Sequence, residues 1–170
     1  RTRFVNRIQD LAGISNVVLA GNPPASFSTM TMDVKYIKDS TEVNSYLHLM
    51  YGTANYFDLY NLKLLAGRMP LNASISAYVV NKSYLKAVGL ENAVDIVGKN
   101  LIVDGDNLPI VGVMEDFNQH SLKYGVAPMA LTGSSYSGKW TQYKTIHFKL
   151  NSNETADWSK TIYGIENIWK

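Results

Sequence analysis

The chain of 170 residues is 46% hydrophobic and 18% charged, which suits one packed domain or two small subdomains and argues against disorder throughout. Its net charge of +2, without a cluster of Lys and Arg, argues against a surface for nucleic acid or anionic membranes. The absence of cysteine excludes a disulfide scaffold and a thiolate metal site. No run of residues reaches the ~18 consecutive apolar residues of a membrane span. The start at Arg1 without Met and the end inside a helical pattern predict a fragment of a longer chain.

The first part of the chain predicts one helix and three strands. Apolar residues at helical spacing indicate an amphipathic helix over residues 3–14, which Gly13 helps to end. A short apolar strand is predicted over 16–20. Apolar and polar residues then alternate over 29–37 and again over 43–51, which predicts an antiparallel hairpin.

The middle of the chain predicts short elements. Asn55 begins a helix over 56–60, and Asn81 caps a second helix over 82–88 that Gly89 closes. A brief apolar run over 62–65 ends at Ala66-Gly67-Arg68, and apolar runs predict further short strands over 78–80, 101–103 and 110–114. A turn signal of Asp-Gly-Asp-Asn joins the last two strands and predicts a second hairpin.

The last part of the chain predicts two strands, over 128–131 and 145–150, around an exposed loop rich in Gly and Ser over 132–139. An amphipathic helix over 154–169 follows, and its apolar face consists of Trp158, Ile162, Ile165 and Trp169. Replacing Ile162 or Ile165 with alanine is expected to cost roughly 2–5 kcal/mol where the side chain is fully buried. Clustered helices and strands in this order predict an α+β fold.

No group of residues predicts a catalytic, cofactor-binding or metal site. His48, His120 and His147 lack the spacing of zinc ligands, and the first and last fall in predicted strands, where we expect them on polar faces. Asp116, His120 and Ser121 lie close in sequence and suggest a hydrolase triad. No nucleophile elbow accompanies them, so a solvated loop is the better interpretation.

Asp104 and Asp106 resemble the start of a calcium-binding loop. The pattern fails at Leu108 and Pro109, where an oxygen ligand and a glycine belong, so a hairpin turn explains the same residues. The isolated glycines of the chain form no phosphate-binding loop. The sequence therefore predicts no cofactor.

Aromatic residues allow a second class of function. The 11 tyrosines and 3 tryptophans could stack on carbohydrate, although most fall at positions that face a core. Three glycosylation sequons begin at Asn72, Asn81 and Asn153, and they matter only in a secreted eukaryotic protein.

Three segments in order carry a recognisable pattern. Residues 54–68 hold Tyr-Phe, an apolar run and Leu-x-x-Gly-Arg. Residues 78–99 hold a strand, Val-Asn-Lys at the start of a helix, and Val-Gly-Lys. Residues 109–131 hold Ile-Val-Gly-Val-x-x-Asp-Phe, then Ser-Leu and a later Pro. The ordered set resembles the MacB-like periplasmic core domain of ABC-transporter permeases of the MacB/FtsX family, with departures only at Ser83 and Val97.

The resemblance implies a split porter-like α/β-sandwich subdomain, residues 1–52 with 125–170, around an inserted β-rich (Sabre-like) subdomain, residues 53–124. It implies a non-enzymatic domain on the periplasmic side of the bacterial inner membrane. Such a domain would couple cytoplasmic ATP hydrolysis to export or mechanotransmission. The implied partners are the cytoplasmic ATPase, reached through membrane helices, a second permease copy and a periplasmic protein, and nucleic acid is not among them.

Two other classes stay open from the residues alone. A secreted glycan- or protein-binding module would use exposed Tyr and Trp, whereas a hydrolase would use His120. Membrane segments flanking Arg1 and Lys170, with a nearby ATPase gene, would favour the permease. A free secreted chain would favour the binding module, and activity lost in His120→Ala would favour the hydrolase. In the permease, the helices over 3–14 and 154–169 are expected to pack on one sheet.

Overall fold

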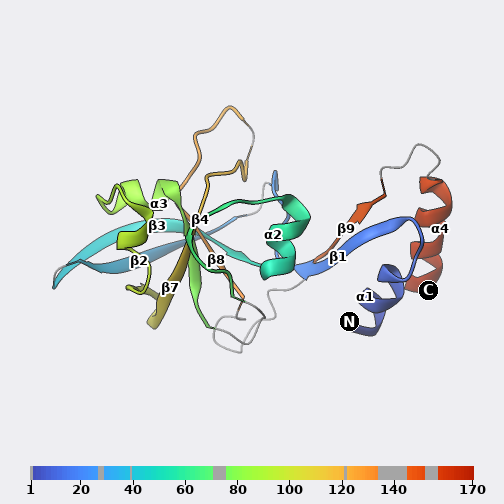
Figure 1. The fold of residues 1–170 in the computed structure, drawn as a ribbon, viewed down its shortest axis with the longest axis horizontal. Helices are drawn as coiled ribbons and strands as arrows, with labels where there is room; N and C mark the ends of the chain where they lie inside the picture. The colour runs from blue at the N-terminus through green and yellow to red at the C-terminus, as the bar shows by residue number, and fades with distance from the viewer. Residues whose placement is uncertain are drawn as a thin grey trace.

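The computed structural model describes residues 2–26, 29–38, 40–70, 76–120, 122–133, 145–151 and 157–170. The elements form two sheets, one of seven strands and one of two, and the α+β prediction is confirmed. The large sheet lies at one end of an elongated molecule, and the small sheet extends from it toward the other end (Figure 1). The two terminal helices lie beside each other at that far end (Figure 1).

The small sheet pairs β1 (Ile14–Ala20) with β9 (Thr145–Leu150) in antiparallel register. Helices α1 (Thr2–Gln9) and α4 (Trp158–Trp169) cover one of its faces. The core between them is apolar and comprises Ile8, Ile14 and Val17, with Phe4, Val5, Leu11, Ile146, Leu150, Ile165 and Ile168 packed around them. The expected packing of both terminal helices on one sheet is therefore confirmed.

The apolar face predicted for α4 is wrong in detail. Trp158, Ile162 and Trp169 are 52%, 47% and 76% exposed, whereas Thr161 is buried and Ile165 packs against the small core. The buried stripe is thus rotated by about one residue, because α4 carries apolar side chains on two adjacent faces and its sequence does not state which one meets the sheet. The large loss of folding stability expected for Ile162→Ala therefore does not apply, since that side chain is half exposed.

The large sheet closes into a ring. It consists of β2 (Met30–Lys38), β3 (Thr41–Tyr51), β4 (Leu64–Gly67), β5 (Tyr78–Asn81), β6 (Asn100–Val103), β7 (Asp106–Met114) and β8 (Met129–Thr132). The strand order is β4-β7-β5-β8-β3-β2-β6, and β6 pairs again with β7. Six strands therefore form a closed barrel, which leaves no free edge around the ring. β4 adds to β7 beside β6.

The barrel interior is a single apolar cluster built from alternate residues of its strands. It contains Val34, Tyr36, Leu47, Leu49, Tyr51, Tyr78, Val80, Leu101, Val103, Ile110, Val113 and Ala130, each at most 5% exposed. Helix α3 (Lys82–Ala87) and the short helix η1 (Ala93–Asp95) cover one opening, where Tyr84, Leu85 and Ile96 complete the cluster. A second cluster lies outside the ring and contacts α2 (Ala54–Tyr60).

Both predicted hairpins are confirmed. β2 pairs with β3 from Met30 opposite Leu49 to Lys38 opposite Thr41, and β6 pairs with β7 around a two-residue turn. Asp104 and Gly105 form that turn with φ values of 49° and 90°. Positive φ at both central residues is the signature of a tight β-hairpin turn.

The strands that pair in each sheet do not follow the two subdomains expected from the sequence. Residues 1–52 and 125–170 were grouped together, yet β2, β3 and β8 pair within the seven-stranded sheet. Alternation of apolar and polar residues identifies a strand but carries no information on its partner. Only the outer residues of those two segments, in α1, β1, β9 and α4, form the small unit.

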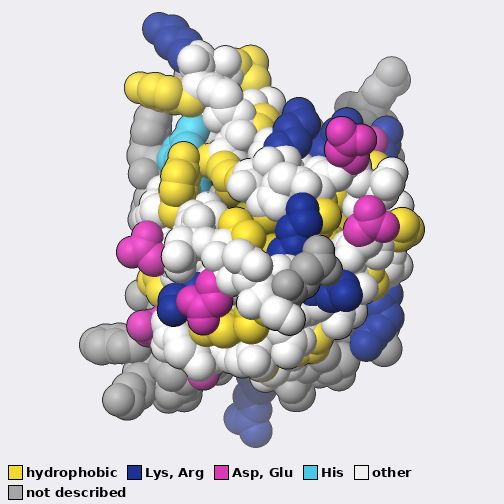
Figure 2. Space-filling view, turned by 90° about the vertical axis from the view of Figure 1, so that its left-hand side faces the viewer, with side chains coloured by type: hydrophobic (Ala, Val, Ile, Leu, Met, Phe, Trp, Pro, Cys, Tyr) yellow, Lys and Arg dark blue, Asp and Glu magenta, His cyan; other side chains and the backbone are white. Residues whose placement is uncertain are grey.

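The end of the barrel opposite the terminal helices has a mixed surface. Figure 2 shows Lys and Arg side chains interspersed with Asp and Glu over this face. In the β2–β3 hairpin, Lys35 and Glu42 form an ion pair of 3.0 Å with both side chains half exposed. Such a pair contributes little to stability because water screens it.

Gly112 lies where three strands meet. It is buried in β7 opposite Gly67 of β4, and a Cβ at position 112 would lie 2.6 Å from the carbonyl oxygen of Arg68. Gly67 itself has a φ of +74°, a conformation that favours glycine. The close approach of the two backbones at Gly112 therefore requires a residue without a side chain.

We predict that Gly112→Ala destabilises the fold by about 1–3 kcal/mol, because the added methyl group forces β4 away from β7. Chemical denaturation measures the free energy of unfolding. Gly125→Ala is the matched control, since a Cβ there meets no atom within 4 Å, and its effect should stay within ~0.5 kcal/mol. Equal effects of the two substitutions would contradict the packing role of Gly112.

Candidate functional site: the joint between the two sheets

Buried Asn81 and partly buried Asp116 form a polar group that ties the barrel elements together. The Asn81 amide donates to Asp116 Oδ1 at 2.8 Å and to the Ala127 carbonyl at 2.9 Å. Its Oδ1 accepts from the backbone N–H groups of Tyr84 and Met129 at 3.1 and 2.8 Å. Asn81 is fully buried with its side chain fully hydrogen-bonded, which avoids the cost of an unpaired buried amide.

Asp116 completes this group from the end of β7. Its Oδ1 accepts from the Ser83 backbone N–H and its Oδ2 from the Ser83 hydroxyl, each at 2.8 Å. The carboxylate therefore lies at the start of α3, where Asn81 is the N-cap as predicted. Two residues from separate segments of the family-like pattern thus meet in space.

The triad considered from the sequence does not assemble among the described residues. Asp116 is bonded to Ser83 and Asn81, while His120 lies against the ring of His48 with centroids 5.5 Å apart. Ser121 lies outside the described residues. Within the described ranges, no three His, Asp or Glu side chains gather as metal ligands.

Two surface predictions also change. Asn81 is fully buried and cannot receive a glycan, whereas Asn72 and Asn153 lie outside the described residues. Thr132 was placed in an exposed loop, but it is 2% exposed and ends β8. The rest of that loop beyond Gly133 is not described.

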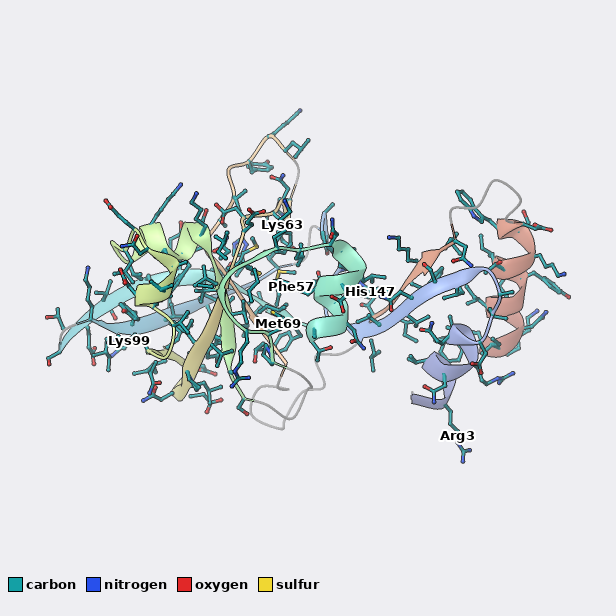
Figure 3. All side chains as sticks on the ribbon, viewed as in Figure 1. Arg3, Phe57, Lys63, Met69, Lys99 and His147 are labelled. Atoms are coloured by element: carbon teal, nitrogen blue, oxygen red, sulfur yellow. The ribbon has the colours of Figure 1, made fainter. Side chains whose placement is uncertain are left out.

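The site that the fold singles out is the joint where the small sheet meets the barrel. Val18 and Ala20 of β1 pack in one buried cluster with Tyr56 and Phe57 of α2. Barrel residues complete the cluster, namely Met50, Val79, Met114, Met129 and Leu131. Figure 3 shows α2 between the barrel and the small sheet, with His147 of β9 beside it. The opposite face of β1 carries Val17, so both faces of this strand are buried.

The His147 side chain on β9 contacts two segments at the joint, the end of β1 near Gly21 and helix α2 at Tyr60. Its Nε2 lies 2.8 Å from the Gly21 carbonyl and its Nδ1 2.6 Å from the Tyr60 hydroxyl. Because a carbonyl only accepts, Nε2 carries the proton, so in the neutral ring Nδ1 accepts from Tyr60. His147 is 6% exposed, which corrects its expected polar-face position. Helix α2 covers that face of β9, and no local sequence signal reveals this cover.

The chain segment that crosses the joint is also held. The Gly21 N–H donates to the Tyr51 carbonyl at 2.8 Å, and the Tyr56 hydroxyl donates to the Asn22 carbonyl at 3.2 Å. Gln119 donates its amide to the Pro23 carbonyl at 3.2 Å. These bonds hold three successive residues of the link between β1 and β2, and their partners lie on β3, on α2 and in the loop after β7.

Burial in the joint changes the acidity of its side chains. Burial lowers the pKa of His147, and the hydrogen bond to Gly21 opposes this effect only partly. Burial likewise raises the pKa of Tyr56, with a smaller contribution from neighbouring Tyr60. Both side chains are therefore neutral at pH 7, and the joint is an uncharged, hydrogen-bonded contact.

We predict that the joint weakens in acid. Because the folded chain lowers the pKa of His147 from 6.5, unfolded chains take up this proton more readily. The stabilisation is complete above about pH 6.5 and declines as the pH falls below it. Urea unfolding between about pH 7.5 and pH 5 should show this slope, and His147→Gln should reduce it. His48→Gln is the comparison variant. Because burial also lowers the pKa of His48, this substitution should remove a separate contribution to the slope of stability against pH. Identical slopes for wild type and His147→Gln would contradict the prediction.

Two solved structures of known proteins are similar in fold to this chain. The extracellular domain of the noncanonic ABC-type transporter YknZ from Gram-positive bacteria is similar at 17% identity and a TM-score of 0.64, covering 94% of this chain and 75% of that chain. The periplasmic region of MacB from Actinobacillus actinomycetemcomitans is similar at 16% identity and a TM-score of 0.61, covering 99% of this chain and 73% of that chain. No curated protein sequence matches the chain.

At these identities the structural likeness establishes the fold, and the family rests on the sequence pattern. Among the helices that the structure describes, none has the length and hydropathy needed to span a bilayer. The sequence pattern of the MacB-like periplasmic core domain matches residues 7–159, which is most of the chain. The protein therefore belongs to the MacB-like periplasmic core domain family, the family of extracytoplasmic domains of ABC-transporter permeases.

Proposed function

We propose that this domain transmits motion from membrane helices of its parent permease to the barrel, and so couples cytoplasmic ATP hydrolysis to a periplasmic output. The observation that carries the proposal is the joint. Its apolar cluster and the bonds of His147 connect the small sheet to the barrel through buried contacts. A displacement of the small unit therefore moves the barrel with it, because packed interiors transmit strain.

The terminal helices are suited to receive such a displacement. Phe4 of α1 contacts Trp169 of α4 with ring centroids 5.1 Å apart, and both helices pack on the small sheet. Both lie at the end farthest from the barrel (Figure 1). Membrane helices adjoining them in the parent chain would act on one unit together. Coupling then requires two positions of the whole domain, small unit and barrel together, relative to the membrane, which the ATPase state favours differently.

The proposal includes a division of the chain and a set of partners. In this proposal the chain has two subdomains, one formed by both ends of the chain and one inserted between them. The expected boundaries lie at 52 and 125, and the strand pairing in the two sheets supports boundaries nearer to 20 and 145. The partners are the cytoplasmic ATPase, acting through membrane helices, a second permease copy and a periplasmic protein. The domain belongs on the periplasmic side of the inner membrane and has no catalytic turnover of its own.

Spin labels on the full-length permease, reconstituted with its ATPase, test the transmission. Arg3 and Lys99 are exposed and lie at opposite ends of the domain (Figure 3), and these 170 residues contain no cysteine to label in error. With labels at Arg3→Cys and Lys99→Cys, we expect one narrow distance distribution that stays the same with and without ATP. The distance from Lys99→Cys to a label in the membrane part should change with ATP.

Tyr60→Ala removes the hydroxyl partner of His147 and part of the joint packing. We predict that it broadens the distribution between the labels at Arg3 and Lys99 and abolishes the ATP-dependent movement, while basal ATP hydrolysis persists. The matched control is Tyr46→Ala, since that ring is 57% exposed on β3 and outside the joint. Undiminished ATP-dependent movement in Tyr60→Ala, with a broadened distribution, would refute transmission through the joint.

A further inference from the structure

Two histidines from distant parts of the chain meet on the outside of the barrel. His48 lies on β3, and His120 lies in the segment between β7 and β8. Their ring centroids are 5.5 Å apart, and the ring planes cross at 86°. The neighbours of His48 on β3, Leu47 and Leu49, belong to the barrel interior, so the alternation of the strand directs His48 outward. Histidine reaches the surface at this end of the barrel, beside hydrophobic side chains (Figure 2).

The imidazole of His48 has a buried nitrogen without a hydrogen-bond partner. Among the residues that the structure describes, only two buried side-chain atoms lack such a partner, and Nδ1 of His48 is one of them. The other is Oε1 of Gln119, the residue before His120. Buried polar atoms normally have a partner, and an exception points to a water molecule or an ion. The two exceptions thus fall on His48 and on the residue next to its ring partner.

The segment that carries His120 is anchored before it reaches the ring of His48. Gln119 is 4% exposed, and its amide donates to the Pro23 carbonyl at 3.2 Å. Earlier in the same segment, the carboxylate of Asp116 is bound at the start of α3. These two anchors hold the His120 ring beside β3. A pair of ligands that is positioned in advance loses less conformational entropy when it binds.

We propose that His48 and His120 together bind one divalent transition-metal ion, with water completing its coordination. Imidazole nitrogen is a preferred ligand of Cu²⁺, Ni²⁺ and Zn²⁺. An ion held about 2 Å from one nitrogen of each ring places the two ring centres roughly 5 Å apart, which is close to the separation in this structure. The proposal revises the expectation from the sequence that the chain has no metal site. The two histidines are distant in the sequence, and only the fold brings them together.

This pair of ligands forms an open and exchangeable site. It supplies fewer protein ligands than structural or catalytic zinc sites have, so a chelator should remove the ion readily. A bound ion connects β3 to the segment between β7 and β8. That segment continues after His120 with two large exposed side chains, Leu122 and Tyr124. The ion therefore restrains the start of an exposed apolar loop on the barrel.

Copper binding to the full-length permease tests the proposal. The permease is purified without a histidine tag, treated with a chelator and titrated with Cu²⁺, which binds such ligands more tightly than the neighbouring divalent ions do. His120→Phe keeps a ring beside His48 and removes the ligand nitrogen. Asn118→Gln, at an exposed position of the same segment, is the matched control. We expect wild type and Asn118→Gln to bind one Cu²⁺ more per chain than either His120→Phe or His48→Gln.

Electron spin-echo spectra of the bound Cu²⁺ supply a second measurement, and in wild type it does not depend on how a variant folds. The signal of two coordinated imidazoles should be present in wild type and in Asn118→Gln, and it should be lost in His120→Phe and His48→Gln. Equal copper stoichiometry in all four proteins would overturn the proposal. A wild-type spectrum without paired imidazoles would also overturn it, since water alone would then satisfy the buried atoms. These measurements use no nucleotide, so their outcome is separate from that of the proposed coupling.

Discussion

Strand β7 is the element on which the rest of the structure depends, because it pairs with three different strands. Its first half pairs with β6 and closes the barrel, and its second half lies between β4 and β5. Gly112 makes this possible by letting the backbone of Arg68 approach closely. Beyond its end, Asp116 reaches the start of α3 and, through Asn81, the first residue of β8. One strand therefore holds β4, β5 and β6 directly and reaches β8 through Asn81.

The barrel and the joint share buried residues. Met114 ends β7 and Met129 begins β8, and both belong to the cluster that packs against Ala20 of β1 and Tyr56 of α2. The polar group at Asn81 fixes the start of β8 from the other side. Buried polar networks with every partner satisfied hold one arrangement in preference to others. The joint thereby inherits its geometry from the barrel, which is the property that a transmitting domain requires.

The small unit contrasts with the barrel in how it is stabilised. The barrel closes on itself and leaves no edge around its ring, whereas the small sheet has two strands that pair only with each other among the described residues, and an apolar groove lies against it. Its helices contact each other through Phe4 and Trp169, near both ends of the chain. The small unit therefore has fewer pairings between strands to stabilise it than the barrel has.

The sequence by itself determined the elements and the family. Alternation identified β2 and β3, the Asp-Gly turn identified the β6–β7 hairpin, and the capping side chain identified the start of α3 at Asn81. These features are local, since each depends on residues within a few positions of one another. The ordered motifs identified the family. Their residues have structural roles in this fold, since Gly112 allows close packing of two backbones and Asp116 accepts hydrogen bonds at the start of α3.

Tertiary structure alone decided strand partners, the buried face of α4 and the joint. β3 pairs with β8 across some 80 residues of chain, and nothing within either strand names the other. Ile162 and Ile165 look alike in sequence, yet only Ile165 packs against the small core. His147 is buried because α2 covers it from far along the chain. Pairing and burial depend on contacts between distant segments, which composition and spacing within one segment do not encode.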